Sequence, residues 1–207
     1  DAESFHLPVL EEFAEYASHA KVFLLSSFCE VLDESVMRDR MYKCRRMLKK
    51  MRENGTFIIY EDACYVNQHL RIFVNEQIHE YLDICSMNED EMMDYIGCRV
   101  DIMEPEAVLK AVKEIYKKLE VPVLVVHSSA WALCYGKNAK SYASVLESGI
   151  TMAATRFWYG GHYGKKEFET VKKIAPSEEN LKFCRAIAEK CPEICCMPCK
   201  DMSFVKH

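Results

Sequence analysis

The chain has 207 residues, enough for one sizeable domain and too few for two of ordinary size. Half of the residues are hydrophobic and 29% are charged, as in soluble globular proteins, and a formal net charge of −5 without a basic stripe argues against a nucleic-acid partner. No run approaches the ~20 apolar residues of a membrane-spanning helix, and no signal peptide is visible. We therefore expect a cytoplasmic protein with no membrane partner.

The first part of the chain alternates apolar runs of strand length with amphipathic segments. The run KVFLLSSF at 21–28 is continuously apolar, as in a buried parallel strand, and GTFIIYEDA at 55–63 ends in two carboxylates. A third strand ends at Ser86. Apolar residues at helical spacing predict helices at 8–19, 34–53, 66–80 and 89–97.

The second part continues the same alternation. Pro105 opens an amphipathic helix that runs through Lys118. The segment VPVLVVHSSAWALCYG at 121–136 predicts one strand that turns directly into another, and EICCMPCKDMSFV at 193–205 predicts one or two short strands. Two further helices are predicted at 140–159 and 177–190.

This alternation predicts a single α/β domain over residues 1–207, a doubly wound, mostly parallel sheet with helices on both faces. The chain has no initiator Met and closes on a strand-like segment, CKDMSFVKH. We therefore expect an internal part of a longer protein.

Polar residues follow each of the four predicted parallel strands. They are Ser26 and Ser27, Glu61 and Asp62, Asn88 to Glu91, and His127 to Ser129. Because parallel strands end at a common edge, these groups predict a ligand crevice there. His127 at the end of VLVV is either a structural histidine or a hydrogen-bonding partner for a nucleotide base or phosphate.

The acidic cluster SMNEDEM has two explanations. Asn88 is a good N-cap, and Glu89, Asp90 and Glu91 interact well with the dipole of the following helix. Alternatively, carboxylates at a strand end hold Mg²⁺ beside a phosphate, directly or through water. The local sequence leaves both open.

Eleven cysteines are many for one chain. Seven of them are scattered through predicted helices and strands, which indicates buried thiols in a reducing compartment. The other four lie in CPEICCMPC at 191–199, where a zinc site is the alternative to buried thiols. No P-loop or Rossmann glycine pattern is present, and YGGHYG at 159–164 follows a predicted helix as a cap and loop.

Together these segments resemble the ADP-dependent sugar kinases, the glucokinase and phosphofructokinase family of the ribokinase-like superfamily. FHLPVLEEF with KVFLLSSFCEVL is similar to the family's helix and serine-ended strand, and SMNEDEM carries its N-x-x-E motif at Asn88 and Glu91. VLVVHSSAWAL is similar to the histidine–threonine strand, with Ser128 in place of threonine, and SYASVLESGITMAATRFWYGG is similar to the next helix. The resemblance covers residues 5–207.

The resemblance implies a nucleotide-binding core without the sugar-binding lid, in a kinase that transfers phosphate from ADP to a hexose or hexose phosphate. It implies that Asn88, Glu91 and Glu61 organise water-bound Mg²⁺, and that His127 and Ser128 line the nucleotide pocket. The family's H-x-E motif has Ile59 in place of its histidine here. The G-x-G-D motif, whose aspartate is the family's catalytic base, is expected beyond His207.

Two alternatives to an ADP-dependent kinase stay open from the sequence. One is a non-catalytic homologue that binds nucleotide, and the other is an ATP-dependent ribokinase-like sugar kinase. A zinc-stabilised interaction module is a third reading, tied to the cysteine cluster. The sequence does not distinguish glucose from fructose 6-phosphate, nor does it give the oligomeric state.

Overall fold

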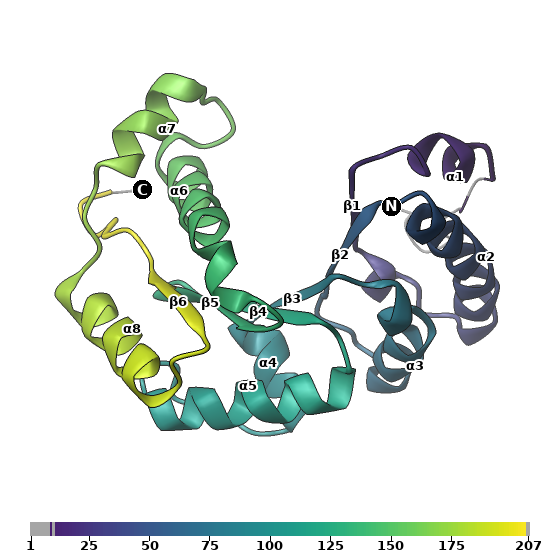
Figure 1. The fold of residues 1–207 in the computed structure, drawn as a ribbon, viewed down its shortest axis with the longest axis horizontal. Helices are drawn as coiled ribbons and strands as arrows, with labels where there is room; N and C mark the ends of the chain where they lie inside the picture. Colours follow the sequence, from purple (N-terminus) through teal and green to yellow (C-terminus); the bar gives the residue numbers. More distant parts are fainter. Residues whose placement is uncertain (1–8, 10, 206–207) are drawn as a thin grey trace.

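The computed structural model describes residue 9 and residues 11–205. Its strands form one mixed sheet whose spatial order follows the chain (Figure 1). Strands β1 to β4 pair in parallel, and β5 is antiparallel to both β4 and β6, so that of the described strands β5 alone is reversed. The strands are β1 (Val22–Leu25), β2 (Phe57–Glu61), β3 (Ile84–Asn88), β4 (Val123–His127), β5 (Trp131–Gly136) and β6 (Cys195–Pro198).

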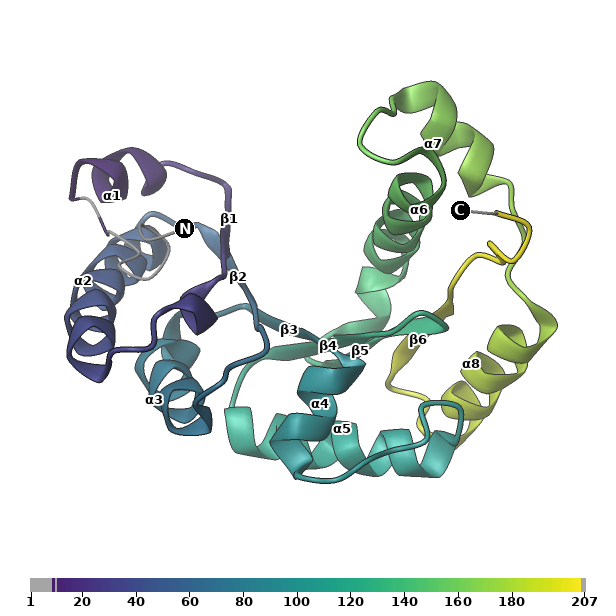
Figure 2. The same cartoon turned by 180° about the vertical axis from the view of Figure 1, so that it is seen from behind.

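Helices cover both faces of the sheet, which confirms the predicted α/β class. One core lies between the sheet and helices α2 to α5 and α8, and a second, smaller core lies under α6 on the opposite face (Figures 1 and 2). Right-handed crossovers between successive parallel strands place their helices on the same face. The helices are α1 (Glu11–Ala17), α2 (Glu34–Glu53), α3 (Gln68–Ile78), α4 (Glu89–Ile96), α5 (Pro105–Leu119), α6 (Ala143–Tyr159), α7 (Lys165–Lys172) and α8 (Glu178–Lys190).

Short 3-10 turns supplement these helices. They are η1 (Phe28–Glu30), η2 (His79–Tyr81) and η3 (Ala139–Tyr142). None of the helices in the described part of the chain is long and apolar enough to cross a membrane.

Local sequence accounts for the two longest crossover helices. At the start of α2, Asp33 Oδ1 accepts hydrogen bonds from the amides of Ser35 and Val36 at 2.8 and 3.0 Å, an N-cap that satisfies amides without an intrahelical partner. Pro105 opens α5, where its missing amide hydrogen costs nothing. The apolar side of this amphipathic helix is buried, at Val108, Val112, Ile115 and Leu119.

Gly136 ends β5 in a conformation that requires glycine. Its φ is +119°, and a Cβ there would lie 2.4 Å from the carbonyl oxygen of Pro122. That carbonyl accepts a hydrogen bond from the Lys137 amide at 2.9 Å, which fixes the chain where it leaves the β4–β5 hairpin. A side chain at 136 would therefore break this close approach.

Some predicted elements differ from the structure. Helix α7 was not predicted, although Glu167 closes over its start by accepting the Gly164 amide at 2.8 Å. The final segment, predicted as one or two short strands, forms one strand, β6, and an isolated bridge between Pro176 and Lys200. The helix predicted at 8–19 forms as α1 (Glu11–Ala17), and its apolar side chains Phe13 and Tyr16 are 50% and 81% exposed.

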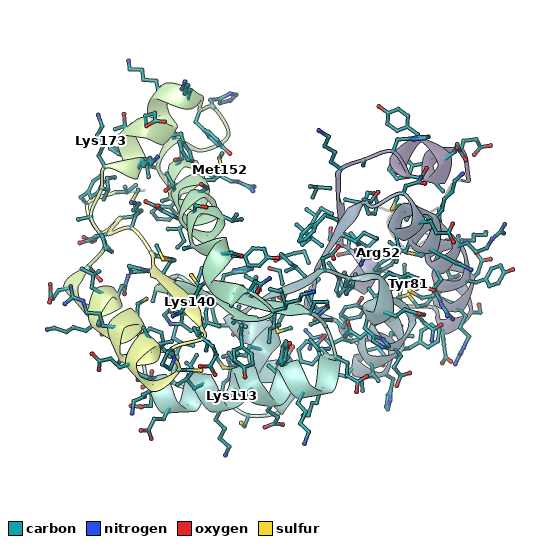
Figure 3. All side chains as sticks on the ribbon, viewed as in Figure 1. Arg52, Tyr81, Lys113, Lys140, Met152 and Lys173 are labelled. Carbon is teal, nitrogen blue, oxygen red and sulfur yellow. The ribbon has the colours of Figure 1, made fainter. Side chains whose placement is uncertain are left out.

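Helices α1 and α2 lie at one end of the sheet, and α6 and α7 project from the other end (Figures 1 and 2). Arg52 and Tyr81 lie at the end with α1 and α2, whereas Lys140, Met152 and Lys173 lie at the end with α6 and α7 (Figure 3).

Candidate functional site at the carboxyl edge of the sheet

The carboxyl ends of β1 to β4 meet at one edge of the sheet, as the sequence predicted. In the strand register, Glu61 of β2 is the partner of Ser86 in β3, and Asn88 of β3 is the partner of His127 in β4. Residues up to 66 positions apart in the sequence therefore lie side by side. This edge is the place where open α/β sheets bind their ligands.

Glu61 and His127 form an ion pair across β3. His127 Nε2 and Glu61 Oε1 are 3.0 Å apart, and the two side chains are 42% and 37% exposed. Burial raises the pKa of Glu61, but hydrogen bonds from His127 and Ser86 together lower it by more, so that the pKa lies below its usual value. The hydrogen bond to Glu61 raises the pKa of His127 and outweighs its burial. Both shifts favour the charged carboxylate and the charged imidazole.

The sequence placed Glu61 with a metal and His127 with a nucleotide, and it missed their pairing. Ser86 was missed as well, because it looked like the last residue of an ordinary buried strand. Only the register of β2 and β3, with Glu61 opposite Ser86, reveals its contribution.

Asn88 and Glu91 form a capping box at the start of α4. Asn88 Oδ1 accepts from the Glu91 amide at 2.8 Å, and Glu91 Oε2 accepts from the Asn88 amide at 2.7 Å. Glu91 is only 4% exposed, and this burial raises its pKa. Its second oxygen, Oε1, has one weak contact, with the Cys64 sulfur at 3.9 Å. The cap thus satisfies one Glu91 oxygen, whereas the other has the weaker contact with the thiol.

Glu89 and Asp90 complete the acidic first turn of α4. Asp90 pairs with Arg99 at 3.3 Å, and both side chains are largely exposed. Glu89 is half-buried. Their charges interact favourably with the amino end of the helix, which accounts for their presence without a ligand.

Ser128 stabilises the turn between β4 and β5. Its Oγ accepts hydrogen bonds from the amides of Ala130 and Trp131, both at 3.1 Å, and donates to the Trp131 carbonyl at 3.2 Å. These three bonds use the Ser128 hydroxyl within the turn. Contact between Ser128 and a nucleotide stays a prediction.

Ser26 and Ser27 bring β1 to the same edge. Their Oγ atoms are 3.3 Å apart, and Ser27 has a φ of +72°, in the left-handed region that serine rarely adopts. Strained residues of this kind concentrate at functional sites. This geometry supports the choice of this edge as the candidate site.

A buried ion pair lies behind the edge, on the helix-covered face. Asp62 and Arg71 of α3 are 0% and 1% exposed at the side chain, with Arg71 Nε 3.2 Å from Asp62 Oδ2. Tyr60 donates its hydroxyl to Asp62 Oδ1 at 3.1 Å, and the Ala63 amide donates to the same oxygen at 2.9 Å. The Arg71 guanidinium also lies 4.4 Å from the centre of the Tyr95 ring. This pair was not predicted, because an arginine in a helix is usually exposed.

Arg71 also connects this pair to α4. Its Nη1 lies 3.7 Å from Asp94 Oδ2. Its positive charge lowers the pKa of both Asp62 and Glu91, although burial is the larger effect and leaves both pKa values raised. Arg71 is therefore an internal counter-charge behind the carboxylates of the edge.

The donors at this edge suit Mg²⁺ held largely through water. In the part of the chain that the structure describes, no group of three or more His, Cys, Asp or Glu side chains is arranged to hold a metal ion. Glu61 is paired with His127, and Asn88 is used by the cap. Mg²⁺ needs only one or two carboxylates when waters and substrate phosphates fill its other positions. Glu61 and Glu91 offer such carboxylates.

All eleven cysteines are free in the structure. Cys64 and Cys98 are exposed, so the expectation that the scattered thiols are all buried is wrong for these two. In the cluster, successive residues of β6 point to opposite faces, which places Cys195 in the smaller core and Cys196 against the larger one.

Neither a protein-family model nor a curated protein sequence matches the chain. Solved structures do match it. A phosphofructokinase from Pyrococcus horikoshii OT3 with AMP has a TM-score of 0.76 and 16% identity over 92% of this chain and 48% of its own. The chain has the fold of the ADP-dependent phosphofructokinases. A reconstructed last common ancestor of these enzymes from Methanosarcinales has a TM-score of 0.76 and 14% identity, with the same two coverages.

An ADP-dependent kinase in complex with fructose-6-phosphate and ADPβS also matches, with a TM-score of 0.75 and 15% identity over 92% of this chain and 50% of its own. The chain thus spans about half the length of the ADP-dependent phosphofructokinases that it resembles. The resemblance stated from the sequence is confirmed for the fold.

Proposed function

We propose that this chain is the nucleotide-binding core of an ADP-dependent sugar or sugar-phosphate kinase. The observation that carries the proposal is the Glu61–His127 pair at the carboxyl edge of four parallel strands, in a chain with the ADP-dependent phosphofructokinase fold. Phosphoryl transfer depends chiefly on positioning and on neutralising charge, and a strand edge with two carboxylates and an imidazole suits both tasks.

In this proposal Glu61 and Glu91 hold Mg²⁺ through water, and Asn88 keeps Glu91 in position through the capping box. The bound ion supplies positive charge to the phosphates of the nucleotide. His127 adds a hydrogen-bond donor and a positive charge at the same edge, and Ser128 shapes the adjoining turn. Burial by the protein makes these charges act more strongly than they would in water.

We further propose that the donor is ADP and the acceptor a hexose or hexose phosphate, with AMP as product. Supporting this, related structures were solved with AMP and with fructose-6-phosphate and ADPβS. The proton of the sugar hydroxyl would go to the aspartate of a G-x-G-D motif, which the present sequence does not contain. All eleven thiols being free supports the cytoplasm as the location.

Calorimetric titration of the chain with ADP, AMP and ATP, with and without Mg²⁺, tests the proposal. We expect ADP to bind more tightly with Mg²⁺ than without it. Glu91→Gln should reduce this Mg²⁺-dependent increase in ADP affinity roughly tenfold. A glutamine at this position still accepts the hydrogen bond from the Asn88 amide. The free energy of unfolding should therefore change by less than about 0.5 kcal/mol. Glu89→Gln is the matched control and should leave the Mg²⁺ effect unchanged. Equal losses from both variants would remove the metal role of Glu91.

One observation favours a non-catalytic nucleotide-binding relative as the second candidate. Ile59 occupies the position of the H-x-E histidine, on the same face of β2 as Glu61 and half-buried. ADP binding by this chain, without phosphorylation of glucose or fructose 6-phosphate by a longer form that includes G-x-G-D, would identify that relative. Tighter binding of ATP than ADP would instead indicate an ATP-dependent sugar kinase.

A further inference from the structure

Two thiols from different elements are in contact at the larger core. Cys184 of α8 is 6% exposed, Cys196 of β6 is half-buried, and their sulfur atoms are 3.3 Å apart. A disulfide bond is about 2.05 Å long, so closure requires the two sulfurs to approach by about 1.2 Å, a distance within reach of a small χ1 rotation at each residue. The two residues are 12 positions apart in the chain.

The other thiols of the segment are placed differently. Cys195 points into the smaller core on the opposite face of the sheet. Cys191 is buried after the end of α8, and Cys199 donates to the Ser128 carbonyl at 3.5 Å. The alternation of side chains along β6 therefore selects one cysteine of the cluster as the partner of α8.

We propose that Cys184 and Cys196 are a redox-sensitive dithiol, a modification site that closes to a disulfide by exchange with a low-molecular-weight disulfide. One thiolate attacks the oxidant, forms a mixed disulfide and releases one small thiolate. The second protein thiolate then attacks the sulfur of its partner and releases the other small thiolate. The protein loses two electrons and two protons, and the small disulfide gains both and becomes two thiols.

The surroundings set the rate of this exchange. The contact with Cys184 and burial both raise the pKa of Cys196, with smaller contributions from Cys195 and Cys199. Since the thiolate is the attacking species, the exchange is slow at neutral pH and faster in mild alkali.

A Cys184–Cys196 disulfide would link α8 to β6 beside the candidate site. After β6 the chain holds two other segments, because the Cys199 amide donates to the Ala130 carbonyl at 2.8 Å and the Asp201 amide donates to the Ala175 carbonyl at 3.0 Å. Ala130 belongs to the turn that follows His127. A bond from α8 to β6 therefore restrains the strand that supports this turn, and it closes a loop that stabilises the folded chain.

Peptide mapping of the whole chain tests the proposal. The reduced protein is incubated with oxidised glutathione at about pH 8.5, quenched in acid, alkylated and digested with trypsin, which gives Phe183-Cys184-Arg185 and the peptide 191–200. We expect these two peptides to be joined, with fragmentation assigning the bond to Cys196, and dithiothreitol to separate them. Absence of the joined peptide, glutathione adducts alone, or a bond to Cys191, Cys195 or Cys199 would overturn the proposal.

Variants sharpen the same measurement. Cys195→Ser is the matched control and should retain the joined peptide, whereas Cys196→Ser should lose it. The map of the unaltered chain decides the proposal by itself, so it does not depend on the folding of either variant. The oxidised chain should also melt at a higher temperature than the reduced chain, and a lower Tm would count against closure in the native geometry.

Discussion

Removing Arg71 alone should destabilise the fold strongly, because it leaves a buried carboxylate without its counter-charge. In Arg71→Met, Asp62 would keep neutral partners: the Tyr60 hydroxyl at 3.1 Å, the Ala63 amide at 2.9 Å and Tyr95. Breaking a buried ion pair from one side costs about 3–5 kcal/mol. At roughly 2–4 °C per kcal/mol for a chain of this size, Tm should fall by roughly 6–20 °C.

Urea unfolding measures this loss directly. Tryptophan fluorescence reports the transition, since Trp131 is fully buried and stacked on Phe183 with ring centres 5.3 Å apart. The double variant Arg71→Met with Asp62→Asn removes both charges and should recover more than half of the lost free energy of unfolding. A single-variant loss below about 1 kcal/mol, or a double variant as unstable as the sum of the two singles, would refute the reasoning.

The pH dependence of the same variant has a definite sign. Burial raises the pKa of Asp62 above its usual value despite the opposing charge of Arg71. A raised carboxyl pKa means that the folded state prefers the protonated form, so the penalty of the bare carboxylate grows as pH rises through that pKa. The difference between Arg71→Met and the unaltered chain should therefore be largest near pH 7 and shrink toward about pH 4. The opposite trend would contradict this assignment.

Further predictions concern the site edge and two glycines. Glu61→Gln should lower the pKa of His127 in an NMR titration, because the bond to Glu61 raises it, and an unchanged pKa would argue against the pair. The pair should stabilise the fold mainly between pH 4.5 and 6.5, since its contribution is lost as pH falls through the lowered pKa of Glu61 and as pH rises through the raised pKa of His127. Gly136→Ala should lower the free energy of unfolding by about 2 kcal/mol or more. Gly149→Ala, in an open helical position with no atom within 4 Å of the added Cβ, should raise it by about 0.5–1 kcal/mol, and equal effects in urea unfolding would contradict this contrast.

Local sequence signals predicted the elements whose stability is local. Helix α2 was predicted at residues 34–53, and Asp33 caps it in the structure. The polar strand ends were predicted as a set, because each follows a recognisable apolar run. Helix α7 escaped prediction because its start is marked only by Gly164 and Glu167, within a glycine-rich loop.

The pairings within the site were beyond local signals. Glu61 meets His127 only because three strands pair in a particular register, and a register is fixed by the assembled sheet. Arg71 meets Asp62 because α3 packs on the face of β2 opposite to Glu61. The cysteine cluster read as one group along the chain, yet β6 divides it between two cores.

The order of the strands also shapes how the chain can assemble. Each described strand after β1 hydrogen-bonds to the strand that precedes it in the sequence, so a new strand can pair with one that is already synthesised. The β1–β2 ladder and the methionine-rich side of α2 can form before β4 and β5 are synthesised. Pairing of sequence neighbours keeps the closing loops shorter than pairing of strands from distant parts of the chain would. The edge that carries the candidate site would then be assembled one strand at a time, and the Glu61–His127 contact would form when β4 joins the sheet.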